Sequence, residues 1–193
     1  VEYPLTSGRR VGLTLNARAE NLFDKEYEDV LHFSAPGRVL IPGCGSGYEV
    51  QAFHEAGYDV TAIDFSPAAV DQTKRVLGAL AERVILGDFF THDFGQYCFD
   101  LIYERTFLCS MPPSRWPDYA NRMGDLLSPV GRLIGVFWYG QQHEPPPYPL
   151  TDKQAEQLFQ RRFRLVRSEL LTDSLPLFRG MERWQEWRKM DQA

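Results

Sequence analysis

Short apolar runs alternate with segments of helical hydrophobic spacing from residue 38 onward. This alternation is typical of strand, helix, strand units and predicts an α/β fold built on a parallel sheet. Apolar and β-branched runs predict strands over 38–41, 59–63, 84–86, 99–103 and 132–139. Apolar positions three and four residues apart, bounded by capping residues, predict helices over 48–56, 66–77, 114–127 and 151–160.

The last part of the chain has a different pattern. Extended segments at 162–171 and 183–190 flank the turn-rich stretch 173–180, which predicts an antiparallel pair of strands. Trp184 and Trp187 lie three residues apart, so a helix is the alternative at that point. With this pair added, we expect a doubly wound, mostly parallel sheet of about seven strands.

The first 37 residues lie outside the alternating pattern. Apolar residues occupy every second position from Val11 to Ala17 and then fall near helical spacing from Leu22 to Leu31. A strand followed by a helix is the local prediction. We expect residues 1–37 to form an atypical N-terminal segment, separate from a domain that spans residues 38–193.

The composition fits one globular domain. The chain has 193 residues, 44% hydrophobic and 24% charged, close to globular averages. Its 21 basic and 26 acidic residues give a net charge of −5, which argues against nucleic acid as a partner. The sequence contains no apolar run long enough to cross a membrane and no signal-peptide pattern, so we expect a cytoplasmic protein that contacts no membrane.

Cysteines and histidines offer little chemistry. The three cysteines, Cys44, Cys98 and Cys109, have no spacing typical of a disulfide framework or a zinc site. We expect three buried free thiols and no metal site. The histidines have no partner spacing, and we assign none of them to catalysis: His32, His54, His92 and His143.

The strongest local signal is the sequence VLIPGCGSGY at 39–48, an apolar strand that leads into a glycine-rich turn and then a helix. Glycine allows a ligand to approach the turn closely and permits dihedral angles closed to other residues. Gly43, Gly45 and Gly47 have the spacing G-x-G-x-G, whereas dinucleotide sites have G-x-G-x-x-G. The spacing therefore disfavours a nicotinamide cofactor.

Two acidic residues follow the next two predicted strands. Asp64 stands at a strand end twenty-one residues after Gly43, where a carboxylate binds the hydroxyls of an adenosyl ribose. The alternative is that the glycines only make a turn and Asp64 caps the next helix. Asp88 precedes Phe89 and Phe90, which together suit an adenine amino group and ring, although either phenylalanine fits a core position equally well.

The fourth predicted strand leads into Glu104 and Arg105. Ligands of open α/β sheets bind at the carboxyl ends of the strands. The carboxylate suits a cofactor ammonium, and the guanidinium suits a carboxylate of cofactor or substrate. The alternative is a solvated ion pair.

Residues 38–188 resemble the thiopurine S-methyltransferase superfamily, which includes plant thiol and halide methyltransferases. The motifs that carry the resemblance occur in family order: VLIPGCGSGYEV, VTAIDFSP, LGDFF, FDLIYERTFLCSMPP, EPPPYPLT and DSLPLFRGMERWQEW. The resemblance implies a Rossmann-like class I methyltransferase that binds S-adenosylmethionine, releases S-adenosylhomocysteine and is monomeric. The cofactor-binding residues that it implies are Pro42, Gly43, Cys44, Gly45, Gly47, Asp64, Phe65, Asp88, Phe89, Glu104 and Arg105.

The chemistry expected of such a site is simple, because a sulfonium methyl group is already activated. The protein mainly aligns a soft nucleophile, such as a thiol, thiopurine, selenium or halide acceptor. Arg105 is the predicted catalytic residue, since a nearby cation favours the thiolate. Tyr139, at the end of the fifth predicted strand, is its weaker predicted neighbour.

The N-terminal segment departs from the family. Family members carry a tryptophan-bearing stretch that closes over the cofactor, but this chain has no tryptophan before Trp116. The stretch LTLNARAENLFDKEYEDVLHFSAPGR instead resembles the C-terminal end of TonB-dependent outer-membrane receptors. A replaced lid leaves a second functional hypothesis, a cofactor-binding domain with little turnover. An NAD-dependent oxidoreductase is the remote third.

Overall fold

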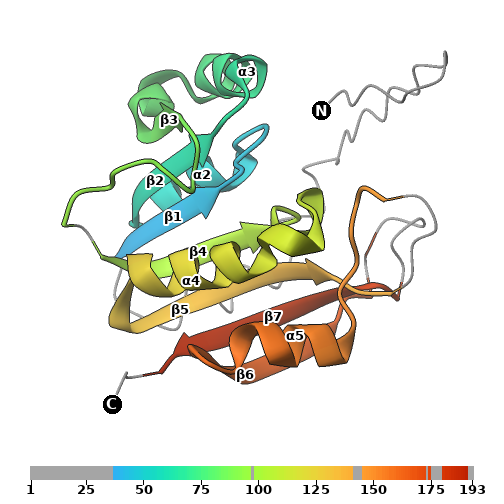
Figure 1. Ribbon diagram of the computed structural model, residues 1–193. Helices are drawn as coiled ribbons and strands as arrows, with labels where there is room; N and C mark the ends of the chain where they lie inside the picture. The colour runs from blue at the N-terminus through green and yellow to red at the C-terminus, as the bar shows by residue number, and fades with distance from the viewer. Residues whose placement is uncertain (1–36, 97, 141–144, 173, 175–179, 191–193) are drawn as a thin grey trace, which may run out of the picture. The chain divides into compact units, whose positions relative to one another are not determined.

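The computed structural model describes residues 37–96, 98–140, 145–172, 174 and 180–190. These residues form one seven-stranded sheet with strand order β3-β2-β1-β4-β5-β7-β6 (Figure 1). The strands are β1 (Arg38–Pro42), β2 (Asp59–Asp64), β3 (Val84–Leu86), β4 (Phe99–Arg105), β5 (Leu127–Trp138), β6 (Phe163–Leu170) and β7 (Glu182–Lys189). The α-helices are α2 (Tyr48–Glu55), α3 (Pro67–Leu77), α4 (Trp116–Leu126) and α5 (Asp152–Phe159). Short 3₁₀ segments are η2 (Gly78–Arg83), η3 (Leu108–Ser110) and η4 (Pro113–Arg115).

Strand pairing confirms the predicted fold. β1 pairs in parallel with β2 and β4, and β4 pairs in parallel with β5. β7 runs antiparallel to both β5 and β6, so the predicted C-terminal pair exists and joins the main sheet. The chain therefore has the doubly wound α/β architecture that its sequence predicts.

The fifth strand is longer than predicted. It begins at Leu127 rather than at residue 132, because its first residue pairs with Phe99. The register then shifts, so that Leu101 pairs with Arg132 and the residues between form an irregularity. Pro129 and Gly131 fall in this irregular part, where no ladder hydrogen bond is required of them.

Helices cover both faces of the sheet. In Figure 1, α4 and α5 lie over the same face, where the Phe159 and Trp187 rings are 4.6 Å apart. On the other face Tyr103 contacts both Phe53 of α2, at 5.3 Å, and Trp184, at 6.3 Å. Residues three apart in a strand point to opposite faces, so the two tryptophans are both buried in β7 without a helix.

Local capping explains where two helices begin. The Ser66 hydroxyl accepts a hydrogen bond from the Ala69 amide at 3.3 Å, and Thr151 forms a capping box with Gln154. None of the helices in the described ranges combines the length and the apolar character needed to cross a bilayer.

Some predictions lie outside the described residues. They are the strand and helix within residues 1–37, most of the turn-rich stretch 173–180, His32 and His143. The domain boundary after residue 37 stays a prediction.

Candidate functional site

The predicted site residues gather at the carboxyl ends of β1, β2, β3 and β4. The strand order reverses between β1 and β4, since β2 and β3 follow on one side and β5 on the other. Loops that leave such a switch point diverge and open a crevice between them. In this chain the loops after β1 and β4 are the glycine turn and the segment that begins at Thr106.

The carboxyl end of β2 holds the glycine turn in place through hydrogen bonds. The Gly43 amide donates to the Ile63 carbonyl at 2.8 Å, and the Gly45 amide donates to Asp64 Oδ2 at 3.1 Å. Asp64 Oδ1 accepts a hydrogen bond from the Ser66 amide at 2.9 Å. The Asp64 carboxylate therefore belongs to the turn, while the side-chain cap of α3 comes from Ser66.

The turn has one open position. Gly45 has φ +49° and a Cβ built there would meet nothing closer than the Gly43 carbonyl oxygen, at 3.9 Å. At Gly47, with φ +71°, a Cβ would lie 2.3 Å from the Thr73 methyl group. The backbone of the turn is thus open to a ligand at Gly45 and packed against α3 at Gly47.

The ring of Phe107, which follows β4, packs against the glycine turn. A Cβ at Gly43 would lie 2.4 Å from its ring, and the same ring meets Phe89 edge-on at 5.4 Å. Phe107 therefore joins the glycine turn to the segment after β3. This contact could not be predicted from the sequence, because an aromatic residue after a buried strand has no local pattern that indicates it.

Glu104 is buried rather than exposed at the strand end. Its side chain accepts hydrogen bonds from the Phe107 and Leu108 amides, at 2.7 and 3.0 Å, and from the Tyr119 hydroxyl, at 2.6 Å. The residue is only 1% exposed, so the solvated ion pair considered from sequence is wrong for Glu104. A cofactor ammonium would have to compete with three hydrogen bonds from the protein.

Burial also raises the pKa of Glu104 to about 7, against 4.5 for a free glutamate. Between pH 4.5 and about pH 7, Glu104 is therefore protonated in the folded protein and ionised in the unfolded chain. The free energy of unfolding falls as the pH rises through this range. Glu104→Gln removes this titration. We expect its free energy of unfolding, relative to the parent, to rise by about 2 to 3 kcal/mol between pH 5 and pH 8. Urea unfolding at the two pH values measures the difference, and parallel pH profiles would contradict it.

Arg105 interacts with an acid that sequence analysis missed. Glu49, in the first turn of α2, is 9% exposed, and burial raises its pKa while its own backbone amide and the charge of Arg105 oppose that rise. The two side chains therefore interact electrostatically at the switch point. The available signal was an acid two residues after the last glycine, where a helix N-terminus favours negative charge.

The segment after β3 presents one carboxylate and two aromatic rings. Asp88 is exposed and its Oδ1 accepts the Phe90 amide at 2.8 Å, whereas Phe89 is 4% exposed and packs edge-on against Phe90 at 5.3 Å. Phe89 therefore has a core position. Phe65, next to Asp64, is instead 72% exposed and free to contact a ligand.

Tyr139 lies one residue beyond β5 with its hydroxyl already engaged. That hydroxyl is 3.1 Å from Gln185 Oε1, and the Arg183 guanidinium lies 4.1 Å from the ring centroid. Its predicted catalytic role stays a prediction. Nearby, at the ends of β4 and β5, is a gap too narrow to hold a water molecule, lined by Glu104, Thr106, Leu108, Cys109, Val136, Phe137, Trp138, Tyr148 and Leu150.

Both buried thiols have a raised pKa. Burial, reinforced by the charges of Asp64 and Glu49, raises the pKa of Cys44 to about 12. Burial and the charge of Glu104 raise the pKa of Cys109 to about 12 as well. Both stay protonated at neutral pH. Cys98 is exposed, so the prediction of three buried thiols is wrong at that position, which directly precedes β4.

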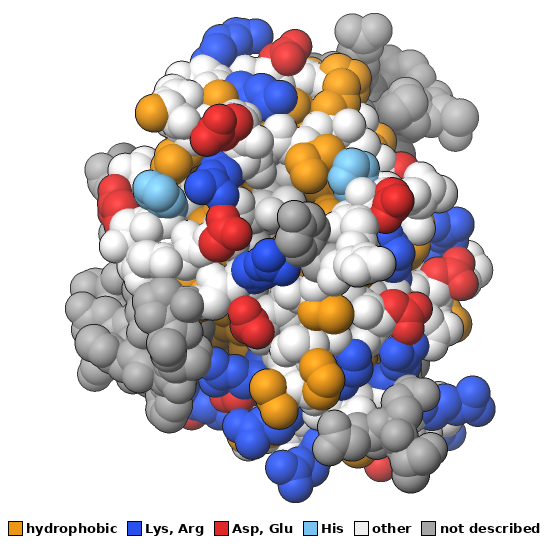
Figure 2. Space-filling model, turned by 90° about the vertical axis from the view of Figure 1, so that its left-hand side faces the viewer, with side chains coloured by type: hydrophobic (Ala, Val, Ile, Leu, Met, Phe, Trp, Pro, Cys, Tyr) orange, Lys and Arg blue, Asp and Glu red, His pale blue; other side chains and the backbone are white. Residues whose placement is uncertain are grey.

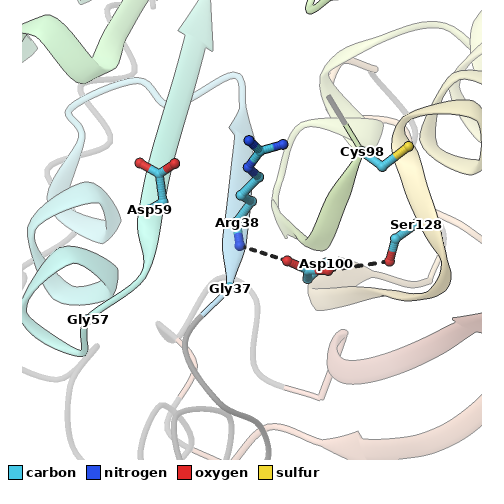
Figure 3. A pocket seen from close by; sticks show the side chains of 7 residues that line it. All are labelled: Gly37, Arg38, Gly57, Asp59, Cys98, Asp100 and Ser128. Atoms are coloured by element: carbon cyan, nitrogen blue, oxygen red, sulfur yellow. Dashed lines mark hydrogen bonds between the residues drawn. The ribbon is translucent and has the colours of Figure 1, made fainter. Parts of the chain in front are cut away.

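A larger cavity, of about 540 Å³, lies at the opposite edge of the sheet, where the strands begin. Figure 3 shows Asp100 there between the Arg38 amide, at 2.9 Å, and the Ser128 hydroxyl, at 3.5 Å. In Figure 2, which faces this edge, basic and acidic side chains are interspersed rather than gathered by sign. Because none of the predicted site residues lines this cavity, the carboxyl edge is the candidate site. No cluster in the described ranges has three side chains able to hold a metal.

Known proteins resemble the chain over most of its length. The thiopurine S-methyltransferase family matches residues 15–189, a match that begins within the atypical N-terminal segment. A probable thiol methyltransferase 2 of Arabidopsis thaliana is 32% identical over 162 residues, 79% of this chain and 70% of the relative. A thiocyanate methyltransferase 1 of Brassica oleracea is 30% identical over 161 residues, with 80% and 71% covered. The receptor-like resemblance of residues 1–37 finds no support among these matches.

Solved structures match the fold. The 1,6-didemethyltoxoflavin-N1-methyltransferase of Burkholderia thailandensis, with bound 1,6-didemethyltoxoflavin and S-adenosylhomocysteine, superposes with a TM-score of 0.69 at 24% identity. The alignment covers 86% of this chain and 78% of that chain. A methyltransferase of Methanosarcina mazei gives a TM-score of 0.70 at 16% identity, with 86% and 98% covered.

Proposed function

Because the chain belongs to the thiopurine S-methyltransferase family, we propose that it transfers the methyl group of S-adenosylmethionine to a small-molecule sulfur acceptor. The observation that carries the proposal is the open backbone at Gly45, pinned by Asp64 at the switch point of the sheet. Because glycine has no side chain, the polar groups of a ligand can approach the backbone of such a turn closely, whereas a side chain at this position would block them.

The residues at this edge fit such a cofactor. A Cβ at Gly45 would enter open space, and the exposed Phe65 and Asp88 stand at the ends of the two neighbouring strands. We propose that the turn holds the methionine end, Asp64 the ribose, and the segment after β3 the adenine. The full proposed set is Pro42, Gly43, Cys44, Gly45, Gly47, Asp64, Phe65, Asp88, Phe89, Glu104 and Arg105.

When bound, the cofactor supplies a methyl group that its sulfonium has already activated. The protein has to orient the acceptor and keep it nucleophilic. We propose that the charge of Arg105 favours the thiolate form of an acceptor, and the same charge acts on the pKa of the buried Glu49. Cys44 and Cys109 do not compete as acceptors, because both thiols stay protonated.

The choice of a soft acceptor rests on its chemistry and on the relatives, because the gap lined by Leu108, Val136 and Leu150 is too narrow to hold even a water molecule. A sulfur nucleophile is weakly hydrated and polarizable, so it loses less on leaving water for a protein site than an alkoxide or an amine does. The related proteins named for thiols and thiocyanate have acceptors of this class.

Methyl transfer to matched acceptors tests the proposal. The purified protein is incubated with S-adenosylmethionine and an aryl thiol, thiocyanate or a thiopurine, with a phenol of the same shape as the control. We expect S-methyl products and no O-methyl product. Binding of S-adenosylhomocysteine without any transfer would instead favour the cofactor-binding domain with little turnover, and binding of NADH alone would favour the oxidoreductase. A monomeric state, a cytoplasmic location and the domain boundary after residue 37 stay predictions.

A further inference from the structure

The segment 87–94, which follows β3, contains no helix or strand. Its own hydrogen bonds converge on Asp88, whose carbonyl accepts the Thr91 and His92 amides at 3.2 and 2.8 Å. Its backbone is joined to β2 by the Gly87 amide, which donates to the Asp64 carbonyl at 3.0 Å. The rings of Phe89 and Phe94 are buried in the core, but Asp88 is exposed, so its backbone needs support from another element if the carboxylate is to keep one orientation.

Arg122 of α4 supplies that support. Its Nε donates to the Phe89 carbonyl at 3.2 Å, and Nη2 donates to the His92 carbonyl. Its guanidinium carbon also lies 6.0 Å from the Phe89 ring centroid and 5.6 Å from that of Phe94. A guanidinium presents several donors in a fixed plane, so one side chain fixes two carbonyls of the segment at once.

The helix that carries Arg122 is anchored in the core. Tyr119 and Met123, its neighbours along α4, are both fully buried in the core. Among the described residues, the Arg122 guanidinium contacts carbonyls and rings but no carboxylate, so its donors are directed to the segment rather than to an ion pair. The orientation of Asp88 is thereby tied to the position of α4.

We propose that Arg122 is a positioning residue for base recognition: it holds segment 87–94 so that the Asp88 carboxylate accepts the exocyclic amino group of adenine. This rests on the proposed function, since it concerns the same cofactor site. The expected effect is confined to the contact between the Asp88 carboxylate and the amino group of adenine. Loss of Arg122 weakens the discrimination between an adenine and a base that lacks the amino group.

Arg115 gives a matched control. It lies seven residues before Arg122, at the end of η4 and directly before α4, and its guanidinium stacks on Phe90 of the same segment at 4.2 Å. In the described structure its side chain donates no hydrogen bond to the segment and pairs with Asp118 at 3.8 Å. Arg115→Met thus removes a cation that contacts the same segment without releasing the two carbonyls.

The test measures the dissociation constants of S-adenosylhomocysteine and S-inosylhomocysteine by calorimetric titration. The inosine base carries an oxygen where adenine carries the amino group, so we expect the parent and Arg115→Met to prefer the adenine ligand by about 10-fold or more. In Arg122→Met the preference is expected to fall to about 2-fold or less, mainly through weaker binding of the adenine ligand. Arg122→Lys, which retains one cation but not the planar fork, is expected to fall between them and carries the test if Arg122→Met does not fold.

Two results would overturn the proposal. Arg122 variants that keep the parent preference, or that weaken both ligands equally, would show that the residue has a general packing role. A parent that binds S-adenosylhomocysteine without preferring it would show that Asp88 does not contact the amino group. In both cases methyl transfer by the parent would leave the proposed function intact, whereas a parent that binds neither ligand would remove both.

Discussion

Asp64→Ala is expected to weaken the binding of S-adenosylhomocysteine by about 100-fold or more. Two effects add in this variant. The carboxylate proposed to bind the ribose hydroxyls is lost, and the Gly45 and Ser66 amides lose the acceptor that holds the glycine turn next to α3. Hydrogen bonds to an ionised group are worth about 1.5 to 3 kcal/mol each, so a ligand that needs this carboxylate loses most of its affinity.

Calorimetric titration of the parent and the variant measures this effect. Asp59→Ala is the matched control, because Asp59 stands at the opposite end of β2, is exposed and pairs with Arg83. We expect it to bind like the parent. Asp64→Asn keeps one oxygen acceptor and should retain part of the affinity. Equal binding by Asp64→Ala and the parent would remove Asp64 from the site.

Gly47→Ala is expected to lower the free energy of unfolding by about 3 kcal/mol or more. The new Cβ would lie 2.3 Å from the Thr73 methyl group, in a backbone conformation with φ +71° that L side chains rarely adopt. Thr73 has no room to yield, since it is fully buried and its hydroxyl donates to the Gly45 carbonyl. Strain and clash therefore add at this position.

Gly45→Ala separates the two contributions. Gly45 also has a positive φ, of +49°, but its added Cβ would meet open space. We expect a loss of stability of only about 1 to 2 kcal/mol, from the backbone conformation alone. Denaturant unfolding of the two variants gives the comparison, and a similar loss in both would mean that α3 moves away from the turn at little cost.

Some of the candidate site follows from sequence because its signals are local. The glycine spacing, the acid at the end of β2 and the serine that caps α3 each depend on residues close together in the chain. Glu104 shows the limit of such signals. Its position at a strand end is visible in the sequence, but its burial depends on Tyr119, fifteen residues away on another element.

Other features arise only when distant elements pack together. Phe107 fills the space at Gly43, Tyr139 bonds to Gln185, and Arg122 reaches the segment after β3. None of these pairs has a fixed separation in sequence, so no spacing rule identifies them. The irregularity at the start of β5 has the same origin. Proline and glycine in the sequence predict a turn there, and only the pairing with β4 shows that the residues belong to a strand.

The sequence by itself determined the alternation of strands and helices, the antiparallel C-terminal pair, the family and the glycine turn with its acid. These depend on hydrophobic period, capping and backbone conformation, which act over a few residues. The tertiary structure alone decided which polar groups are buried, which carboxylates keep a raised pKa and which side chains hold the site segments in place. Burial and hydrogen-bond partners are properties of the packed chain, since they depend on residues that approach each other only when the sheet and its helices assemble.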